Sequence, residues 1–326
     1  MIIRPNSYKG VNFITADNGR GLRLVLCDQG ASVYAVYFQE RIMVATPFSK
    51  EAFLNDTTKY WGQTVGPLAL RYKKGRYKIG KEVFRMVPNE RGNTLHSSTL
   101  NYGKLMFDTK VEIGREFTEI IFTRFVEVKP SEGTSADVKV VYRVYEKENR
   151  FEIAYEMVPV RPALFNPTNH IYWNLGEPSV LDLRLQMPCD TRLAYDKDMI
   201  PKKKAIPITP LFDFNAGKSI GRDIDDQKLQ DSIHHGYDHY FFLKEGKVTL
   251  EGPTIRLTVQ TDREGAQIYT DNYPGPLRLL GMNGEHEHRY GGVTFETCDD
   301  PRLVSHPVYL PDSPYTSLTS YLFETR

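Results

Sequence analysis

Apolar and polar residues alternate with a period of two along much of the chain, and this alternation predicts β-strands. It appears first in residues 22–26 and 31–38, and the intervening Cys27-Asp28-Gln29-Gly30 predicts a turn between two hairpin strands. Similar runs follow at 111–113, 119–126, 138–145, 151–157, 181–185, 247–250 and 254–259. A helical period is rarely sustained, and the best helix candidate is the short stretch 223–233.

This strand pattern predicts an all-β fold built as a large antiparallel β-sandwich. The 24 glycines and 20 prolines suit the many turns that such a fold requires. No Gly-rich or Ser-rich linker divides the chain, and all-β architectures often run past about 200 residues as one unit. We therefore expect a single domain spanning residues 1–326.

Charge and cysteine content restrict the partners and the compartment. With 42 basic and 41 acidic residues the formal net charge is +1, so no global field favours nucleic acid or an anionic membrane. The three cysteines are too few for a disulfide scaffold and too widely spaced for a metal knuckle, which favours a reducing compartment. The chain starts without an apolar signal region and contains no run of 18 apolar residues. We expect a cytoplasmic monomer or homodimer with a small, neutral ligand.

Residues 166–175, Asn-Pro-Thr-Asn-His-Ile-Tyr-Trp-Asn-Leu, hold the mixture of side chains that a sugar site needs. The rings of Tyr172 and Trp173 can stack on the C–H face of a pyranose, while amides and a hydroxyl bind its substituents. His170 can move a proton near neutral pH. A structural histidine packed beside strand aromatics is the alternative interpretation.

Other chemically suggestive stretches follow one another at defined places along the chain. They are Gly-Pro-Leu-Ala-Leu-Arg at 66–71, Leu-His-Ser-Ser at 95–98, Phe-Asp-Phe at 212–214, Tyr-Asp-His at 237–239, Gln-Ile-Tyr-Thr at 267–270 and Phe-Glu-Thr at 295–297. Each stretch is a weak signal alone, but their order together with the stretch around His170 is specific.

This ordered set resembles the aldose 1-epimerase (galactose mutarotase) family, from about residue 66 to residue 323. The family's Thr-Asn-His-x-Tyr-Phe-Asn-Leu is similar to residues 168–175, and its Leu-His-Gly-Gly is similar to residues 95–98. The resemblance implies a large twisted β-sandwich of the galactose mutarotase-like supersandwich type. It also implies an isomerase that interconverts the α and β anomers of a free aldohexose without metal or other cofactor.

Residue by residue, the resemblance implies that Glu296 is the general base and His170 the general acid. It also implies that Arg71, His96 and Asp238 hold the sugar, to which we add the aromatic face of Trp173. As alternatives, Glu296 is a carboxylate at a sheet edge and Asp238 caps a turn.

The sequence departs from the family at several positions near these residues. Pro67 stands where an arginine is usual, Leu70 replaces an asparagine, Ser97 and Ser98 replace two glycines, and Cys298 falls where a glutamine is common. We expect the first four of these positions, Pro67, Leu70, Ser97 and Ser98, to flank the sugar and to change which hexose is preferred rather than to end catalysis.

Other functions remain open from the sequence. A non-catalytic carbohydrate-binding protein would keep the binding residues but could lose the base, and a hexose-phosphate epimerase would use the basic residues Lys73, Lys74 and Arg76. A two-carboxylate glycosidase fits poorly, because the expected acid is a histidine. His286 and His288 could present two imidazoles on one face of a strand, but the glycines around them favour a polar loop over a metal site.

Overall fold

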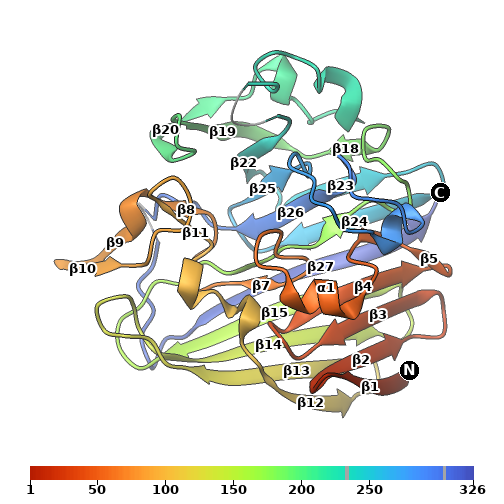
Figure 1. The fold of residues 1–326 in the computed structure, drawn as a ribbon, viewed down its shortest axis with the longest axis horizontal. Helices are drawn as coiled ribbons and strands as arrows, with labels where there is room; N and C mark the ends of the chain where they lie inside the picture. The colour runs from red at the N-terminus through yellow and green to blue at the C-terminus, as the bar shows by residue number, and fades with distance from the viewer. Residues whose placement is uncertain (232–234, 304–305) are drawn as a thin grey trace.

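The computed structural model describes residues 1–231, 235–303 and 306–326, and these form three large antiparallel sheets. In Figure 1 both chain termini lie on the right, whereas the short strands β8 to β11 project on the left. Among the described residues, none of the helices combines the length and the hydrophobicity needed to cross a bilayer.

One layer of the fold is a nine-stranded sheet. Its order is β12 (Asp108–Ile113), β13 (Phe117–Val126), β14 (Ala136–Tyr145), β15 (Arg150–Pro159), β27 (Tyr315–Thr325), β24 (Ile255–Thr261), β23 (Lys247–Glu251), β18 (Arg184–Gln186) and β21 (Lys218–Ser219). Long meander pairs dominate it, and β14 pairs with β15 from Ala136↔Pro159 to Val144↔Phe151. Buried and exposed residues alternate along β13, β24 and β27, as expected for strands with one face on a core.

Two sheets form the facing layer. The five-stranded sheet contains β1 (Ile2–Tyr8), β2 (Val11–Asp17), β3 (Leu22–Cys27), β4 (Ser32–Phe38) and β5 (Arg41–Ile42) in chain order. The seven-stranded sheet has the order β20 (Pro201–Pro207), β19 (Cys189–Tyr195), β22 (Asp238–Leu243), β25 (Gly265–Tyr269), β26 (Val293–Cys298), β17 (Tyr172–Trp173) and β6 (Val44–Ala45). The central strands β25 and β26 of this second sheet are almost completely buried.

Short elements complete the fold. Three two-stranded sheets pair β9 (Arg76–Ile79) with β10 (Glu82–Arg85), β8 (Arg71–Tyr72) with β11 (Thr94–Leu95), and β7 (Thr64–Val65) with β16 (Thr168–Asn169). The described α-helix, α1 (Lys50–Asn55), begins where Ser49 accepts a hydrogen bond from the N–H of Ala52. The 3-10 turns are Lys73–Gly75, Ser98–Leu100, Tyr102–Lys104, Pro210–Phe212, Ile220–Asp223 and Leu280–Met282.

A single large hydrophobic cluster lies between the layers. It joins Leu24 of the five-stranded sheet, Val140 and Phe323 of the nine-stranded sheet, and Ile268 and Phe295 of the seven-stranded sheet. The described chain is therefore a twisted antiparallel β-sandwich, and the predicted all-β fold is confirmed.

Most predicted strands are confirmed, but two local predictions are wrong. The described part of 223–233 forms turns that follow a 3-10 segment, because Asp226 caps the N–H of Lys228 and so stops a helix from propagating. Residues 232 and 233 of this prediction lie outside the described residues. In 181–185 only the end is strand β18, since Ser179 accepts from the N–H of Leu181 and forms a turn.

Gly62 allows its loop to lie close against the backbone of β4, behind the stretch that carries His170. Its φ is +56°, its N–H donates to the carbonyl of His170 at 2.9 Å, and an added Cβ would overlap the carbonyl oxygen of Val33. Only glycine meets both conditions without strain.

We expect Gly62→Ala to lower the free energy of unfolding by about 2–5 kcal/mol, through steric overlap added to the cost of a positive φ. Gly80→Ala is the matched control, because Gly80 has a φ of +58° but open space around its Cβ direction. Urea denaturation of both variants measures the difference. Equal losses would show that the contact with Val33 is unimportant.

Candidate active site

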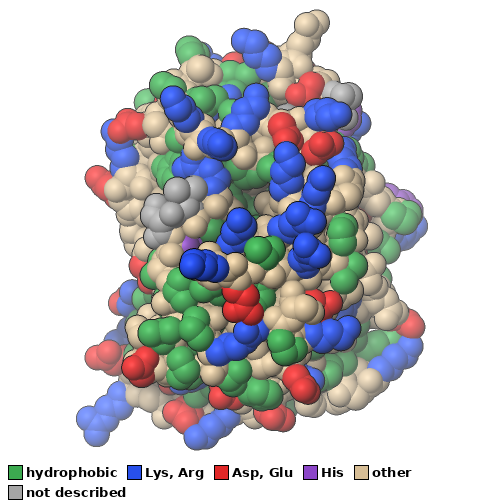
Figure 2. Space-filling model, turned by 90° about the vertical axis from the view of Figure 1, so that its left-hand side faces the viewer, with side chains coloured by type: hydrophobic (Ala, Val, Ile, Leu, Met, Phe, Trp, Pro, Cys, Tyr) green, Lys and Arg blue, Asp and Glu red, His purple; other side chains and the backbone are tan. Residues whose placement is uncertain are grey.

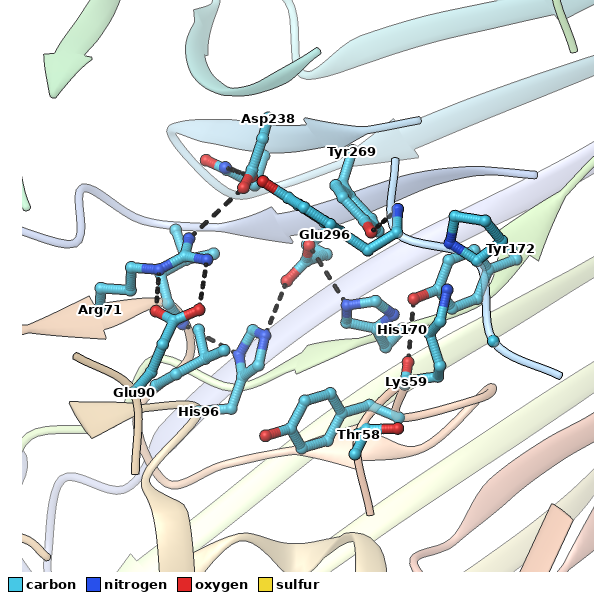
Figure 3. Close-up of a pocket in the computed structure, with 17 residues that line it drawn as sticks. Thr58, Lys59, Arg71, Glu90, His96, His170, Tyr172, Asp238, Tyr269 and Glu296 are labelled. Atoms are coloured by element: carbon cyan, nitrogen blue, oxygen red, sulfur yellow. Dashed lines mark hydrogen bonds and ion pairs between the residues drawn. The ribbon is translucent and has the colours of Figure 1, made fainter. Parts of the chain in front are cut away.

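A cavity of about 330 Å³ opens between the seven-stranded sheet and the loops that follow α1, β10 and β25. This volume is at the small end of the range for sites that bind small molecules, about 300–1,000 Å³. Figure 3 shows its polar side chains, which come from distant parts of the sequence.

One wall of the cavity is the face of β22, β25 and β26. In the antiparallel register Asp238 lies opposite Tyr269, and Gln267 lies opposite Glu296. Because side chains alternate between the two faces of a sheet, all four point to the same side. The strand pattern therefore brings the two predicted carboxylates, Asp238 and Glu296, into one cavity.

Two of the short strand pairs provide the opposite wall. The pairing of β8 with β11 puts Leu95 beside Arg71. Because His96 follows Leu95 in the chain, Arg71 and His96 both line the cavity. His170 directly follows β16. This strand pairs with β7, where Asn169 lies opposite Thr64, and the pairing fixes the position from which His170 enters the cavity. The structure thus brings together five of the six predicted site residues: Arg71, His96, His170, Asp238 and Glu296.

Glu296 lies between two imidazoles at the buried end of this cavity. Its Oε1 is 3.5 Å from Nε2 of His170, and its Oε2 is 3.8 Å from Nε2 of His96. Both rings point toward the carboxyl group in Figure 3. Tyr60 covers the rings, with its centroid 4.7 Å from that of His96 and 5.8 Å from that of His170.

Burial controls the charge of these three groups. Loss of solvent raises the pKa of Glu296 to about 8, with a further rise from Asp238 and an opposing effect of Arg71. Burial lowers the pKa of His170 to about 3, and burial together with His170 and Arg71 lowers the pKa of His96 well below its ordinary value. At neutral pH the cavity therefore holds two neutral imidazoles and a carboxyl group that is largely protonated.

The position of the proton on His96 is fixed by the backbone. Nδ1 of His96 accepts a hydrogen bond from the N–H of Leu70 at 3.2 Å, so in the neutral ring Nε2 carries the proton and faces Glu296. His96 is therefore a hydrogen-bond donor to the cavity.

The same tautomer bears on metal binding. Ligand atoms of His96, His170 and Glu296 lie within 4.8 Å of one another, close enough to surround a metal ion. A protonated Nε2 on His96 has no lone pair to give, and its Nδ1 is occupied by the backbone of Leu70. This donor set fits a proton-transfer site better than a metal site.

Arg71 is held by two carboxylates. Glu90 accepts from Nε at 2.5 Å and from Nη2 at 3.1 Å, while Oδ2 of Asp238 lies 3.6 Å from Nη1. Asp238 also accepts a short hydrogen bond from Gln267, which in turn accepts from the hydroxyl of Tyr195 at 2.9 Å. Burial alone lowers the pKa of Arg71, but Asp238 and Glu90 raise it above its ordinary value.

A second cation, Lys59, lines the cavity and is also paired twice. Its Nζ lies 2.6 Å from Asp271 and 2.5 Å from Glu287, both of which are fully buried. Burial raises the pKa of Asp271 to about 6 against the opposing charge of Lys59. In Figure 3, Lys59 and Arg71 lie on opposite sides of the two histidines.

The sequence analysis missed Glu90, Lys59 and Gln267 as site residues. Gln267 was within a recognised motif, and its place opposite Glu296 follows only once the strand register is known. No local pattern marks Glu90 or Lys59, because their partners lie 19 and 212 residues away along the chain.

The prediction that Trp173 contacts the sugar is wrong. Trp173 is 1% exposed, does not line the cavity and packs against Phe151, Tyr321 and Phe323 in the core. In β17 neighbouring side chains point to opposite faces, so Tyr172 faces the cavity and Trp173 faces the core.

Of the altered residues, Leu70 lines the cavity. Pro67, Ser97 and Ser98 do not line it, and neither does Cys298. The hydroxyl of Ser97 instead accepts from the N–H of Leu68 and donates to its carbonyl, at 2.9 and 2.8 Å.

His286 and His288 lie in a loop, as the surrounding glycines indicate. Nδ1 of His286 is 3.2 Å from the carbonyl of Pro276, and Nδ1 of His288 is 2.9 Å from the carbonyl of Arg289. Neither belongs to a group with metal-binding spacing among the described residues.

The family model for aldose 1-epimerase matches residues 12–317 of the chain. Among curated proteins, galactose mutarotase from Mus musculus is 29% identical over 266 residues, covering 77% of this chain and 74% of the mouse protein. Aldose 1-epimerase from Escherichia coli (strain K12) is 27% identical, covering 95% of this chain and 94% of the bacterial protein.

Solved structures share the fold. Galactose 1-epimerase from Lactobacillus acidophilus NCFM superposes with a TM-score of 0.86 at 24% identity, covering 99% of this chain and 98% of that one. A GalM/aldose epimerase homologue from C. elegans gives a TM-score of 0.83 at 21% identity, covering 97% of this chain and 99% of that one. At these identities the likeness supports the architecture alone.

Proposed function

The chain belongs to the aldose 1-epimerase family of isomerases, and we propose that it interconverts the α and β anomers of a free aldohexose such as galactose or glucose. The observation that carries the proposal is the buried carboxyl group of Glu296, 3.5 Å from the imidazole of His170 in a cavity of monosaccharide size. Two proton carriers that face each other across one cavity are what the reaction requires.

Anomer exchange needs one proton to leave the C1 hydroxyl and one to reach the ring oxygen. In the proposed mechanism Glu296 takes the first and His170 gives the second, which opens the ring to an aldehyde. Rotation about C1–C2 exposes the other face of the carbonyl, and the reverse transfers close the ring. Each turnover restores both side chains, so the protein needs no cofactor for the proton balance.

The pair Glu296 and His170 works with a single shared proton. With the cyclic sugar, Glu296 is ionised and removes the proton of the C1 hydroxyl, while His170 is protonated. With the open-chain aldehyde, Glu296 is protonated and His170 is neutral. Both states hold one proton, and burial of the cavity favours the second. Sugar hydroxyls that replace lost solvent around Glu296 bring the two states closer in energy.

Other side chains stabilise the charge that moves during ring opening. Nε2–H of His96 points at Glu296 and is available to the C1 oxygen as it becomes a carbonyl. Arg71 and Asp238, joined to Gln267, present donors and acceptors for the ring hydroxyls. In place of Trp173, the tyrosines Tyr60 and Tyr269 supply aromatic surface in the cavity.

The charges in the cavity favour a neutral aldose over a hexose phosphate. Among the described lining residues the Lys and Arg side chains are Lys59 and Arg71, and each is already paired with two carboxylates. A phosphate group would have to displace these carboxylates or lie beside them. The phosphate alternative relied on three basic residues that are exposed and do not line the cavity, Lys73, Lys74 and Arg76. Figure 2 shows that Lys and Arg side chains are numerous on this outer face of the molecule.

A purely sugar-binding protein is a weaker candidate. Among the described residues, no group hydrogen-bonds to the buried Oε2 of Glu296. Binding alone would be served better by an amide at this position, whereas proton transfer requires the carboxyl group.

Polarimetry on freshly dissolved sugars tests the proposed function. We expect the protein to accelerate the optical change of α-galactose and α-glucose, with a kcat/KM for glucose 6-phosphate at least about tenfold lower because of the paired carboxylates. No acceleration of any neutral aldose would contradict the proposal. Preference for the phosphate would favour the phosphosugar epimerase instead.

We expect Glu296→Gln to lower kcat by about 10²- to 10⁴-fold while sugar binding persists, because the amide keeps the shape but cannot accept a proton. Glu152→Gln is the control, since Glu152 is equally buried but lies in β15 away from the cavity. Initial rates and equilibrium galactose binding separate the two effects. A Glu296→Gln variant with a third of the wild-type kcat would rule out Glu296 as the base.

The pH dependence follows from the shared proton. We expect kcat/KM to be level near neutral pH and to fall about tenfold per pH unit above about 8, where Glu296 and His170 together lose their proton. The acid limb, set by a second proton on His170, should lie near pH 3. Rates corrected for spontaneous mutarotation between pH 5 and 10 measure the alkaline limb. An increase through pH 8 would mean that the fully deprotonated pair is the active form.

A further inference from the structure

Glu90 contacts Arg71 from a turn that no recognised motif includes. It lies between β10 and β11, where its N–H donates to the carbonyl of Asn93 at 3.1 Å and its carbonyl accepts from Asn93 at 2.7 Å. These backbone bonds fix the start of the side chain, which lines the cavity and accepts from two nitrogens of Arg71. The pair is a two-point, side-on contact of a guanidinium with a carboxylate.

The donors of Arg71 can be counted. A guanidinium has five N–H groups in a fixed plane, of which Glu90 accepts two and Asp238 faces a third. Two N–H groups remain for a ligand, and their direction is set by the plane that Glu90 fixes. Without Glu90, the guanidinium could turn toward Asp238 and would lose this orientation.

Glu90 also has hydrogen-bonding capacity of its own. A carboxylate offers about four lone-pair sites, and two of them accept from Arg71. The side chain is 30% exposed at the cavity wall, so the remaining sites are accessible to a sugar hydroxyl. A hydroxyl at this place could donate to Glu90 and accept from Arg71 at once.

We propose that Glu90 is a positioning and specificity residue, which orients Arg71 and accepts a hydrogen bond from a hydroxyl of a neutral aldose. This inference rests on the proposed epimerase function and identifies a residue on which its substrate recognition depends. It predicts that Glu90 acts on binding more than on the proton-transfer step.

Glu90 has a second, electrostatic effect on Glu296. The groups around the carboxyl of Glu296 come from several elements. They are Asp238 from β22, Arg71 from β8, the neutral rings of His96 and His170, the phenols of Tyr60 and Tyr172, and Thr294 and Cys298 on its own strand. Asp238 raises the pKa of Glu296, whereas Arg71 and Thr294 lower it. Because Glu90 offsets the charge of Arg71, removing Glu90 strengthens the lowering effect.

The test compares Glu90→Gln and Glu90→Asp with wild type, using galactose and glucose. For Glu90→Gln we expect KM to rise about 5- to 30-fold, as one charge-assisted contact is lost, with kcat changed less than about threefold. The alkaline limb of kcat/KM should move to lower pH. A residue with a merely structural role would not shift that limb in a defined direction.

Glu90→Asp separates charge from geometry. It keeps the negative charge beside Arg71, so the alkaline limb should stay near its wild-type position. The side chain is one methylene shorter, so from the same backbone position its carboxylate cannot reach both nitrogens of Arg71, and KM should still rise. Should Glu90→Gln fail to fold, this variant alone tests the orientation of Arg71.

Glu82→Gln is the matched control, because Glu82 lies in β10, pairs with Arg161 at 3.0 Å and does not line the cavity. Its KM and pH profile should equal those of wild type. If both Glu90 variants keep the KM of wild type and the same alkaline limb of kcat/KM, the role of Glu90 is overturned while the epimerase function stays intact. A wild-type protein without epimerase activity would overturn both.

Discussion

The structure depends on keeping the carboxyl group of Glu296 away from water without giving it a permanent cationic partner. Its neighbours are two imidazoles that burial keeps neutral, and Arg71 stands further off, already bound to Glu90 and Asp238. A direct ion pair would have fixed Glu296 as a carboxylate and left it a weak base. Desolvation instead holds its proton affinity near neutrality, where acid and base catalysis are most effective.

The same principle extends to the cations of the cavity. Arg71 and Lys59 each lie between two carboxylates, so their donors remain directed while their charge is balanced. Buried pairs of this kind contribute little net stability, because desolvation offsets the attraction between the charges. These pairs instead fix orientation. The carboxylates around Arg71 hold the plane of its guanidinium at one end of the cavity, and those around Lys59 anchor its loop at the other end. A rigid polar wall of this type suits recognition of hydroxyl groups, which differ only in direction.

The sequence predicted those parts of the structure that a local pattern or an ordered set of motifs determines. Alternation predicted the long strands, and the family resemblance carried by the ordered motifs implied five residues that line the cavity. It failed where tertiary contacts decide. Trp173 and Tyr172 look equivalent in sequence, but the direction of a strand only two residues long sends one to the core and one to the cavity. Six-residue α1 is too short to show a helical period, and Glu90 and Lys59 gain meaning only from partners that the fold brings near.

Three of the departures from the family pattern, at Leu70, Ser97 and Ser98, stand at backbone positions of positive φ, as does the neighbouring His96, and the sequence alone could not reveal this. Leu70, His96, Ser97 and Ser98 all have a positive φ, between +51° and +65°. Glycine is the usual solution at such positions, but Ser97 offsets the strain by two hydrogen bonds to Leu68. Leu70 uses its backbone rather than its side chain, since its N–H holds His96 in the tautomer that donates to the cavity. These substitutions therefore preserve the geometry of the proposed proton-transfer site, and in the proposed function sugar preference rests on the polar groups that reach the cavity, Glu90 among them.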